Sequence, residues 1–253
     1  MRVAHIVPTK FLWVIEGAEY HMCLGHLIGE DFDYTSFYKK EAFNGSYVIM
    51  DNGVYETGQP LPIDEICRKA NMIGASEIIL PDYYKDGEKS LEATREAIEY
   101  ARNNFKGKLM AVPQGKNLEE WLHNAILTLS LDIDVLGVPK WLSGEGMRTR
   151  LKALQTLDHL TRGREVHLLG CAENPIESQL IATAGRAGAF PEVRGIDSCI
   201  AFKYAEHNMF FEDGPRPEGE MDFDANTCKL ECLVENIKHW NYLVDLGGTE
   251  DER

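Results

Sequence analysis

The 253-residue sequence lacks the features that mark several classes of protein. Its six cysteines are too few for a disulfide scaffold, so we expect a reduced protein whose core forms without cross-links. No run approaches the ~18 consecutive apolar residues that a membrane-spanning helix needs. Pro8 and Lys10 interrupt the first apolar stretch, which therefore does not resemble a secretory signal peptide. We expect a soluble, cytoplasmic protein with no membrane partner.

Positive charge is also scarce, and its distribution is uneven. The chain has 26 Lys and Arg against 41 Asp and Glu, which gives a net charge of −15. Such a total argues against a polyanionic partner, because nucleic-acid-binding proteins usually have a basic surface. Almost half of the excess lies in Glu206–Glu235, where nine acidic and two basic residues give a net charge of −7. The rest of the chain therefore remains a candidate for binding nucleic acid.

Short apolar runs rich in Val, Ile, Leu and Met recur along the first part of the chain. Runs of this kind are typical of parallel strands that are buried on both faces. The eight runs are Val3–Val7, Tyr20–Ile28, Tyr47–Met50, Glu77–Leu80, Leu109–Val112, Val135–Val138, Val166–Leu169 and Val193–Ile196. Amphipathic stretches between the runs predict helices at Asp64–Ile73, Ser90–Asn103, Leu118–Leu129, Met147–Leu160 and Pro175–Ala184, the last capped by Asn174.

The alternation of strands and helices predicts an α/β fold built from βαβ units. Eight strands in about 200 residues favour a single-domain (β/α)8 TIM barrel over residues 1–205. A doubly wound open sheet is the alternative, although no Gly-x-Gly-x-x-Gly follows any strand. Residues 206–253 are expected to form an acidic loop and a C-terminal helix, from Asn226 to about Leu246, that packs on the barrel.

Polar side chains follow several strands, at the end of a barrel where catalytic groups usually lie. Asp51, Asp82 and Asp197 come at the ends of three strands, and Gln114 follows a fourth. Each aspartate alone has a structural explanation, because the first precedes Asn-Gly in a turn and the other two could cap helices. Together they predict a cleft of carboxylates with shifted pKa values, where one acts as nucleophile and another as acid or base.

Five segments in this order resemble motifs of the tRNA-guanine transglycosylase superfamily over about residues 20–200. They are Met50–Gly53, Leu80–Asp82, Val112–Gly115, His167–Pro175 and Gly195–Ile200. The first is similar to the family's DSGG segment and the second to the segment of its second substrate-binding aspartate. The third and fourth are similar to its VQG and LMGVG-x-P segments. The fifth is similar to the segment that contains its nucleophilic aspartate. Val54 replaces a glycine of the first segment. The short chain most resembles the phage and bacterial DNA 7-deazaguanine transglycosylases, the DpdA group.

The resemblance implies a pentosyltransferase that replaces guanine in DNA with a free 7-deazaguanine base of the preQ0 type, through a covalent aspartyl-glycosyl intermediate. By position, Asp197 is the nucleophile and Asp51 the general acid/base. The residues implied to bind the base are Asp82, Gln114, Gly115, Gly137, Leu169, Gly170 and Tyr55. Tyr55 either stacks on the base or packs beneath it. The resemblance also implies a phage-encoded protein that acts in the host cytoplasm.

Three other functions stay open: the same exchange on tRNA, a non-catalytic subunit of this fold, and an unrelated barrel lyase or aldolase with Lys140 as its Schiff-base lysine. DNA is favoured because the chain is short and lacks the complete zinc pattern of the tRNA enzymes. Cys228, Cys232 and His239 could share one helix face and bind zinc, but a packed Cys/His face is commoner. We therefore expect no cofactor.

A basic stretch between positions 140 and 164 is the expected contact for DNA, or alternatively tRNA. Glu145 and Asp158 oppose its six basic residues, for a net charge of +4: Lys140, Arg148, Arg150, Lys152, Arg162 and Arg164. A solvated helix face is the alternative explanation. The negative total predicts weak, salt-sensitive binding, so a helper protein that opens DNA is a candidate partner.

Overall fold

Eight parallel strands form the centre of the protein. The computed structural model describes residues 1–146, 148–161, 163–171, 174–190, 193–219 and 221–245. The strands are β1 (Arg2–His5), β2 (Tyr20–Cys23), β3 (Tyr47–Met50), β4 (Glu77–Ile79), β5 (Lys108–Ala111), β6 (Val135–Val138), β7 (Glu165–Leu168) and β8 (Val193–Ser198). They lie in one sheet in the order β1-β8-β7-β6-β5-β4-β3-β2, and β1 lies beside β2, so the sheet nearly closes.

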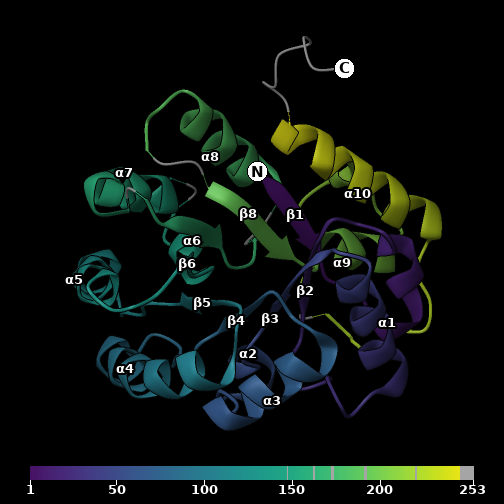
Figure 1. The fold of residues 1–253 in the computed structure, drawn as a ribbon. Coiled ribbons are helices and arrows are strands. Elements are labelled where there is room, and N and C mark those ends of the chain that lie inside the picture. Colours follow the sequence, from purple (N-terminus) through teal and green to yellow (C-terminus); the bar gives the residue numbers. More distant parts are fainter. Residues whose placement is uncertain (147, 162, 172–173, 191–192, 220, 246–253) are drawn as a thin grey trace.

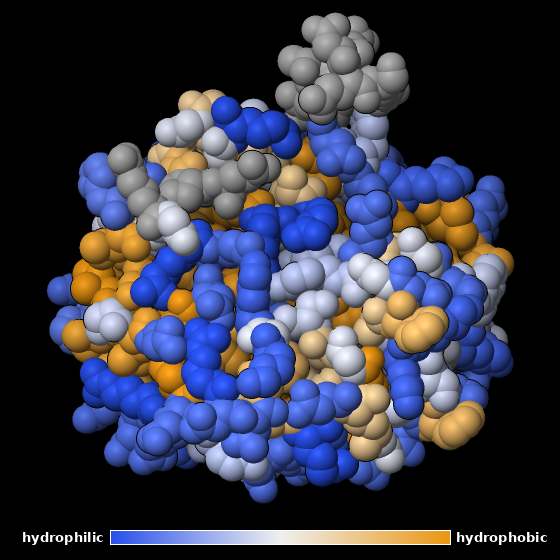
Figure 2. Space-filling view, in the orientation of Figure 1, coloured by the Kyte–Doolittle hydropathy of each residue, from blue (hydrophilic) through white to orange (hydrophobic). Residues whose placement is uncertain are grey.

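Helices surround this barrel on the outside (Figure 1). They are η1 (Thr9–Ile15), α1 (Phe32–Phe43), α2 (Val54–Thr57), α3 (Ile63–Ile73), α4 (Gly87–Asn104), α5 (Leu118–Leu129), α6 (Trp141–Gly144), α7 (Thr149–Thr161), α8 (Ile176–Arg186), α9 (Ile200–Glu206), η2 (Phe211–Asp213) and α10 (Leu230–Asp245). Hydrophilic residues predominate on the face that Figure 2 shows, as expected where helices turn their polar sides outward. The predicted single-domain (β/α)8 barrel is confirmed.

Two glycines make room for large side chains inside the barrel. A Cβ at Gly195 in β8 would lie 2.6 Å from the ring of Tyr20, and a Cβ at Gly137 in β6 would lie 2.8 Å from Val112. Real side chains cannot approach so closely, so both positions require glycine for steric reasons. Because Gly195 has no side chain, the buried Tyr20 ring can pack directly against the backbone of β8.

Charged side chains close the amino end of the barrel. Arg194 of β8 donates to Glu165 at 2.6 Å and to Glu77 at 2.5 Å. The Tyr47 hydroxyl donates to the other carboxylate oxygen of Glu77 at 2.6 Å, and Glu77 is fully buried. Because a buried charge that loses its partner is costly, this network fixes β3, β4, β7 and β8 relative to one another.

Several predicted boundaries were wrong. β2 ends at Cys23 rather than Ile28, and the chain after it forms a loop and then α1, which was not predicted. α8 begins at Ile176, one residue after Pro175, although Asn174 accepts a hydrogen bond from the Ile176 N–H at 3.0 Å, as a capping side chain does.

The C-terminal region differs from the prediction in detail. α9 was not predicted, and it crosses the expected boundary between residues 205 and 206. α10 begins at Leu230 rather than Asn226, because the chain before it is irregular; Leu246 and Met147, the expected helix ends, lie outside the described residues. α10 packs against α8, α9 and β1, as expected of a helix that covers the barrel. No helix in the described part of the chain is both long and apolar enough to span a membrane.

Candidate active site

The three predicted carboxylates meet at the carboxyl end of the barrel. Asp51 and Asp82 follow β3 and β4, and Asp197 lies near the end of β8. Burial raises the pKa of Asp51 well above its ordinary value, and the neighbouring Glu56 carboxylate raises it further. Asp82 and Asp197 also raise the pKa of Asp51, so the three groups interact electrostatically at one site.

Asp197 is held by two hydrogen-bond donors. Its Oδ1 lies 3.0 Å from Nε2 of His167, and the backbone N–H of Gly170 lies 3.3 Å from both carboxylate oxygens. The side chain is buried, with a relative exposure of 6% for the residue. The predicted alternative, that Asp197 caps the following helix, is wrong, because Ser198 Oγ accepts from the Ile200 N–H at the start of α9.

His167 links Asp197 to the barrel interior. Its Nδ1 lies 2.9 Å from the Tyr20 hydroxyl, and the imidazole is fully buried. Burial raises the pKa of Tyr20 well above its ordinary value, so the hydroxyl keeps its proton and can donate it to Nδ1. In the tautomer that accepts this proton, Nε2 carries the imidazole N–H and donates it to Asp197.

Gly170 adopts a conformation that other residues rarely reach. Its φ is +63°, and a Cβ there would lie 3.0 Å from Cδ of Lys140. Glycine therefore allows the chain after β7 to turn its N–H toward Asp197 while the Lys140 stem packs against it. Gly170 thus contributes its backbone N–H to the candidate site, whereas its predicted contact with a base stays a prediction.

Asp82 is the centre of a buried amide–carboxylate network. Asn52 Nδ2 donates to its Oδ1 and Gln114 Nε2 to its Oδ2, both at 2.7 Å. Burial raises the pKa of Asp82 to about 6, against the two amide hydrogen bonds, which lower it. The alternative explanation, that Asp82 caps a helix, is wrong. The cap of α4 is Asp86, whose carboxylate accepts a hydrogen bond from the Lys89 N–H in the first turn.

Two donors fix the orientation of Gln114. Its Oε1 accepts from Trp141 Nε1 at 2.9 Å and from the backbone N–H of Lys85 at 3.2 Å. The amide nitrogen must therefore point toward Asp82. Gln114 thus connects the loop after β4 with α6 and holds the Asp82 carboxylate between them.

Asp51 occupies a rigid turn. Its Oδ2 accepts from the Gly53 N–H at 2.7 Å, so the predicted turn geometry is present. A Cβ at Gly25 would lie 2.2 Å from the Asp51 carbonyl oxygen, so the loop after β2 passes directly against the aspartate backbone. The turn therefore fixes the Asp51 carboxylate through one of its oxygens.

Tyr55 lies on the surface rather than beneath the site. It is 59% exposed in α2, and the Lys140 Nζ lies 5.4 Å from its ring centroid. The alternative that Tyr55 packs beneath a base is therefore wrong. Because Lys140 follows β6 and Tyr55 follows β3, their contact spans the mouth of the barrel.

The remaining predicted base-binding positions have different surroundings. A Cβ at Gly115 would lie 2.5 Å from the backbone nitrogen of Trp121, so Gly115 packs against α5. Gly137 lies inside the barrel, where a Cβ would lie 2.8 Å from Val112 and 3.2 Å from Cδ1 of Leu169. Leu169 is half-buried at the end of β7, between the interior and the site.

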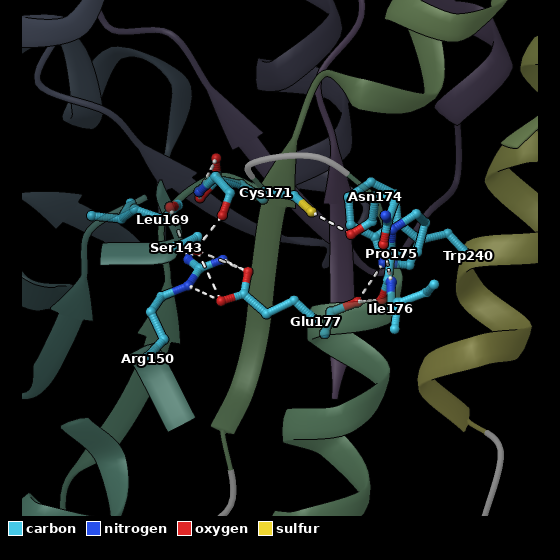
Figure 3. A network of polar contacts seen from close by, with 12 residues as sticks. Ser143, Arg150, Leu169, Cys171, Asn174, Pro175, Ile176, Glu177 and Trp240 are labelled. Carbon is cyan, nitrogen blue, oxygen red and sulfur yellow. Dashed lines mark hydrogen bonds and ion pairs between the residues drawn. The ribbon is translucent and has the colours of Figure 1, made fainter. Parts of the chain in front are cut away.

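The predicted basic stretch does not form one surface. Arg150 is fully buried, and its Nε donates to Glu177 at 3.0 Å. Its guanidinium also donates to the carbonyl of Gly170 at 2.9 Å. Figure 3 shows that Ser143 belongs to the same network, where its hydroxyl donates to Glu177. The prediction that Arg150 contacts nucleic acid is therefore wrong. Arg164 precedes β7 at the opposite end of the barrel and donates to the carbonyls of Ile133 and Leu131, so it too cannot reach the site.

Three of the six basic residues remain near the candidate site. Lys140 lies at the barrel mouth, and Arg148 and Lys152 are exposed around the start of α7. Arg162 lies outside the described residues, as do residues 172–173 of the segment that resembles LMGVG-x-P. The cationic surface beside the site is therefore smaller than the sequence predicted.

The candidate zinc ligands are dispersed. Cys228 precedes α10, Cys232 is fully buried in the core, and His239 Nδ1 lies 2.8 Å from Glu212 Oε1. Within the described ranges, no three His, Cys, Asp or Glu side chains are grouped so that they could hold a metal ion. The shared helix face that the sequence suggested is not formed, because Cys228 is not helical.

Three residues of the site were not among the predicted site residues: His167, Asn52 and Trp141. His167 lies two positions before Leu169 on β7, and period-two alternation could have placed it inside the barrel. Asn52 and Trp141 have no comparable signal, because their roles depend on Asp82 and Gln114 from other strands. No protein-family model and no curated protein matches the chain.

Proposed function

We propose that the protein is a base-exchange pentosyltransferase, which replaces guanine in DNA with a 7-deazaguanine of the preQ0 type. The observation that supports this most is the contrast among three carboxylates at one barrel end. Asp197 accepts hydrogen bonds from His167 and from the Gly170 N–H, whereas burial and neighbouring carboxylates raise the pKa of Asp51 and favour its protonated form. Asp82 is held by two amides. Such different surroundings suit a nucleophile, an acid and a binding group.

In the first half-reaction, a carboxylate oxygen of Asp197 attacks C1′ of a deoxyguanosine in DNA. A C1′–O bond forms as the C1′–N9 bond breaks, and the departing guanine takes a proton from Asp51. The raised pKa of Asp51 supports this role, because a proton is then available near neutral pH. The products are free guanine, an ionised Asp51 and a glycosyl ester on Asp197.

The second half-reaction reverses these steps with the new base. The incoming 7-deazaguanine transfers its N9 proton to the ionised Asp51 and attacks C1′, which releases Asp197 as a carboxylate. Both catalytic groups thus return to their starting protonation states, and no cofactor enters the balance. The two N–H donors on Asp197 assist this release, since they stabilise the returning negative charge.

The amide–carboxylate network around Asp82 suits the hydrogen-bonding edge of a guanine. Each carboxylate oxygen of Asp82 accepts one amide N–H and retains a second lone pair for an N–H of the base. Gln114 likewise uses one N–H for Asp82 and retains another for the base carbonyl. An analogue that lacks these groups would leave buried polar atoms unpaired, so discrimination should be strong.

Base exchange with labelled substrates tests the proposal. Protein is incubated with labelled guanine or preQ0 and, separately, with single-stranded DNA, duplex DNA and tRNA. We expect label in DNA, and a protein–DNA adduct that is lost in Asp197→Asn but not in Asp33→Asn, an exposed aspartate in α1. Label in tRNA alone would favour the alternative substrate, and label in none of the three would exclude the exchange reaction.

A further inference from the structure

Four of the seven exposed aromatic side chains of the described residues lie in the segments that follow the first four strands. They are Trp13, Phe32, Tyr55 and Tyr84, which are 56–82% exposed. They belong to the segments that follow β1, β2, β3 and β4 in turn. Large exposed rings are usually few, and a group of them beside a polar site indicates a binding surface.

Lysines accompany the aromatic residues of the loop after β4. The Lys85 Nζ lies 5.2 Å from the Trp141 ring and 5.8 Å from the Tyr84 ring, and the Lys89 Nζ lies 3.6 Å from the Tyr83 ring. Lys140 and Tyr55 form the corresponding pair on the other side of the mouth, at 5.4 Å. Cation–aromatic pairs hold both a flat ring and a positive charge at each position.

Backbone strain connects this loop to the site. Lys85 has a φ of +57°, a conformation that costs free energy in a residue with a side chain. It is held there by its N–H, which donates to Oε1 of Gln114, the residue whose amide nitrogen binds Asp82. The structure therefore fixes the Tyr84–Lys85 loop relative to the base-binding network, as expected when a strained residue has a role in binding.

We propose that this surface, the aromatic–lysine rim, binds single-stranded DNA on either side of the exchanged deoxyguanosine. The rim consists of Tyr55, Tyr83, Tyr84, Lys85, Lys89 and Lys140. Exposed rings can stack only on bases that are not already stacked in a duplex, and the lysines neutralise the flanking phosphates. The inference rests on the proposed function for the identity of the central nucleotide, but strand binding itself can be measured without any reaction.

Net charge also favours a single strand over a duplex. The whole chain has a net charge of −15, so most of its surface repels a polyanion. A single strand has a lower charge density than a duplex and gains stacking free energy on every exposed ring. The three lysines of the rim should therefore be enough to bind a single strand, whereas a duplex should bind only weakly.

Fluorescence anisotropy with a labelled oligonucleotide tests the rim. The probes are a 12-nucleotide DNA that contains a central deoxyguanosine, its blunt duplex, and RNA of the same base sequence. We expect the DNA strand to bind at least tenfold more tightly than the duplex. Tyr55→Ala and Tyr84→Ala should each weaken strand binding by roughly 5- to 100-fold, and Lys89→Gln should reduce the salt slope by about 0.7.

Tyr242→Ala is the matched control, because Tyr242 in α10 is also 59% exposed but lies away from the barrel mouth. Circular dichroism confirms that each variant is folded. Equal binding of strand and duplex, equal loss in Tyr242→Ala, or tighter binding of the RNA would overturn the inference. Strand binding that depends on the rim, without transfer of base, would support the rim while excluding the proposed reaction.

Discussion

Nε2 of His167 lies 3.0 Å from Oδ1 of Asp197, and the two side chains extend from adjacent strands into the same barrel interior. When the Tyr20 hydroxyl donates to Nδ1 on the other side of the imidazole, Nε2 is the donor to Asp197. The imidazole therefore orients the carboxylate from one side through a single N–H. Such orientation suits a nucleophilic carboxylate, because it presents one oxygen in a fixed direction.

Substitution of His167 tests this positioning role. His167→Phe should lower the rate of base exchange by roughly 10- to 100-fold, as loss of an orienting partner typically does, while the KM for the free base changes little. Tyr20→Phe should lower the rate less, because the imidazole stays in place and loses only the hydrogen bond that favours one of its two tautomers. His159→Phe is the control, since that side chain is 85% exposed on α7. A rise in KM without a change in kcat would contradict the assignment.

The pKa of Asp82 predicts an acid limit for base binding. Burial raises this pKa from the ordinary 3.8 to about 6, so the carboxylate becomes protonated as the pH falls through 6 rather than through 4. A protonated Asp82 loses an acceptor for the base, and we expect the KM for the free base to rise about tenfold for each pH unit below 6. The measurement is the pH profile of exchange from pH 4.5 to 8. A KM that stays constant down to pH 5 would show that Asp82 does not bind the base as an anion.

Arg150 should contribute to stability rather than to DNA binding. Arg150→Met leaves Glu177 buried without its partner, which should lower the free energy of unfolding by about 3–5 kcal/mol. The double variant Arg150→Met/Glu177→Leu should recover most of this loss, because no lone charge remains buried. Arg148→Gln, on the exposed side, should change stability by less than about 0.5 kcal/mol. Urea denaturation measures all three, and a stable Arg150→Met protein with weakened DNA binding would restore the sequence-based prediction.

Gly195 should be intolerant of any side chain while Tyr20 is present. A Cβ at Gly195 would lie 2.6 Å from the Tyr20 ring, so Gly195→Ala should cost about 1–3 kcal/mol of stability and displace the hydroxyl from His167. In a Tyr20→Ala background the same change should cost much less, which a double-mutant cycle detects. Gly144→Ala is the control, because its Cβ would meet nothing within 4 Å. Equal costs in both backgrounds would mean that the strain arises elsewhere.

The fold was predictable because buried parallel strands have a strong local pattern. All eight apolar runs became strands, and the helix at Leu118–Leu129 was predicted with both ends correct. α1 was missed because its buried residues are two tyrosines and a glutamate, Tyr34, Tyr38 and Glu41, none of which marks an apolar helix face. α9 was missed for the opposite reason: it is buried on nearly all sides, so its sequence shows no polar period.

The candidate site was predictable only as far as strand ends determine it. Asp51, Asp82, Gln114 and Asp197 lie where the ends of their strands place them. The partners of these residues come from elsewhere in the chain, as Asn52 does for Asp82 and Glu177 for Arg150. A charge pattern along the sequence cannot show that an arginine is buried by a glutamate 27 positions later. For this reason the prediction of one basic surface between positions 140 and 164 was wrong.

The pairing of β1 with β8 determines when the barrel can be completed during synthesis. Arg2 lies opposite Gly195, so in the described part of the chain β1 pairs with a strand that is synthesised long after it, whereas β2 to β8 can add to one another in sequence. At ~5–20 residues per second, β1 waits roughly 10–40 s for its neighbour. Its neighbour in the sheet, β8, also contains Asp197, so the pairing that completes the strand order and the placement of the candidate nucleophile are one event.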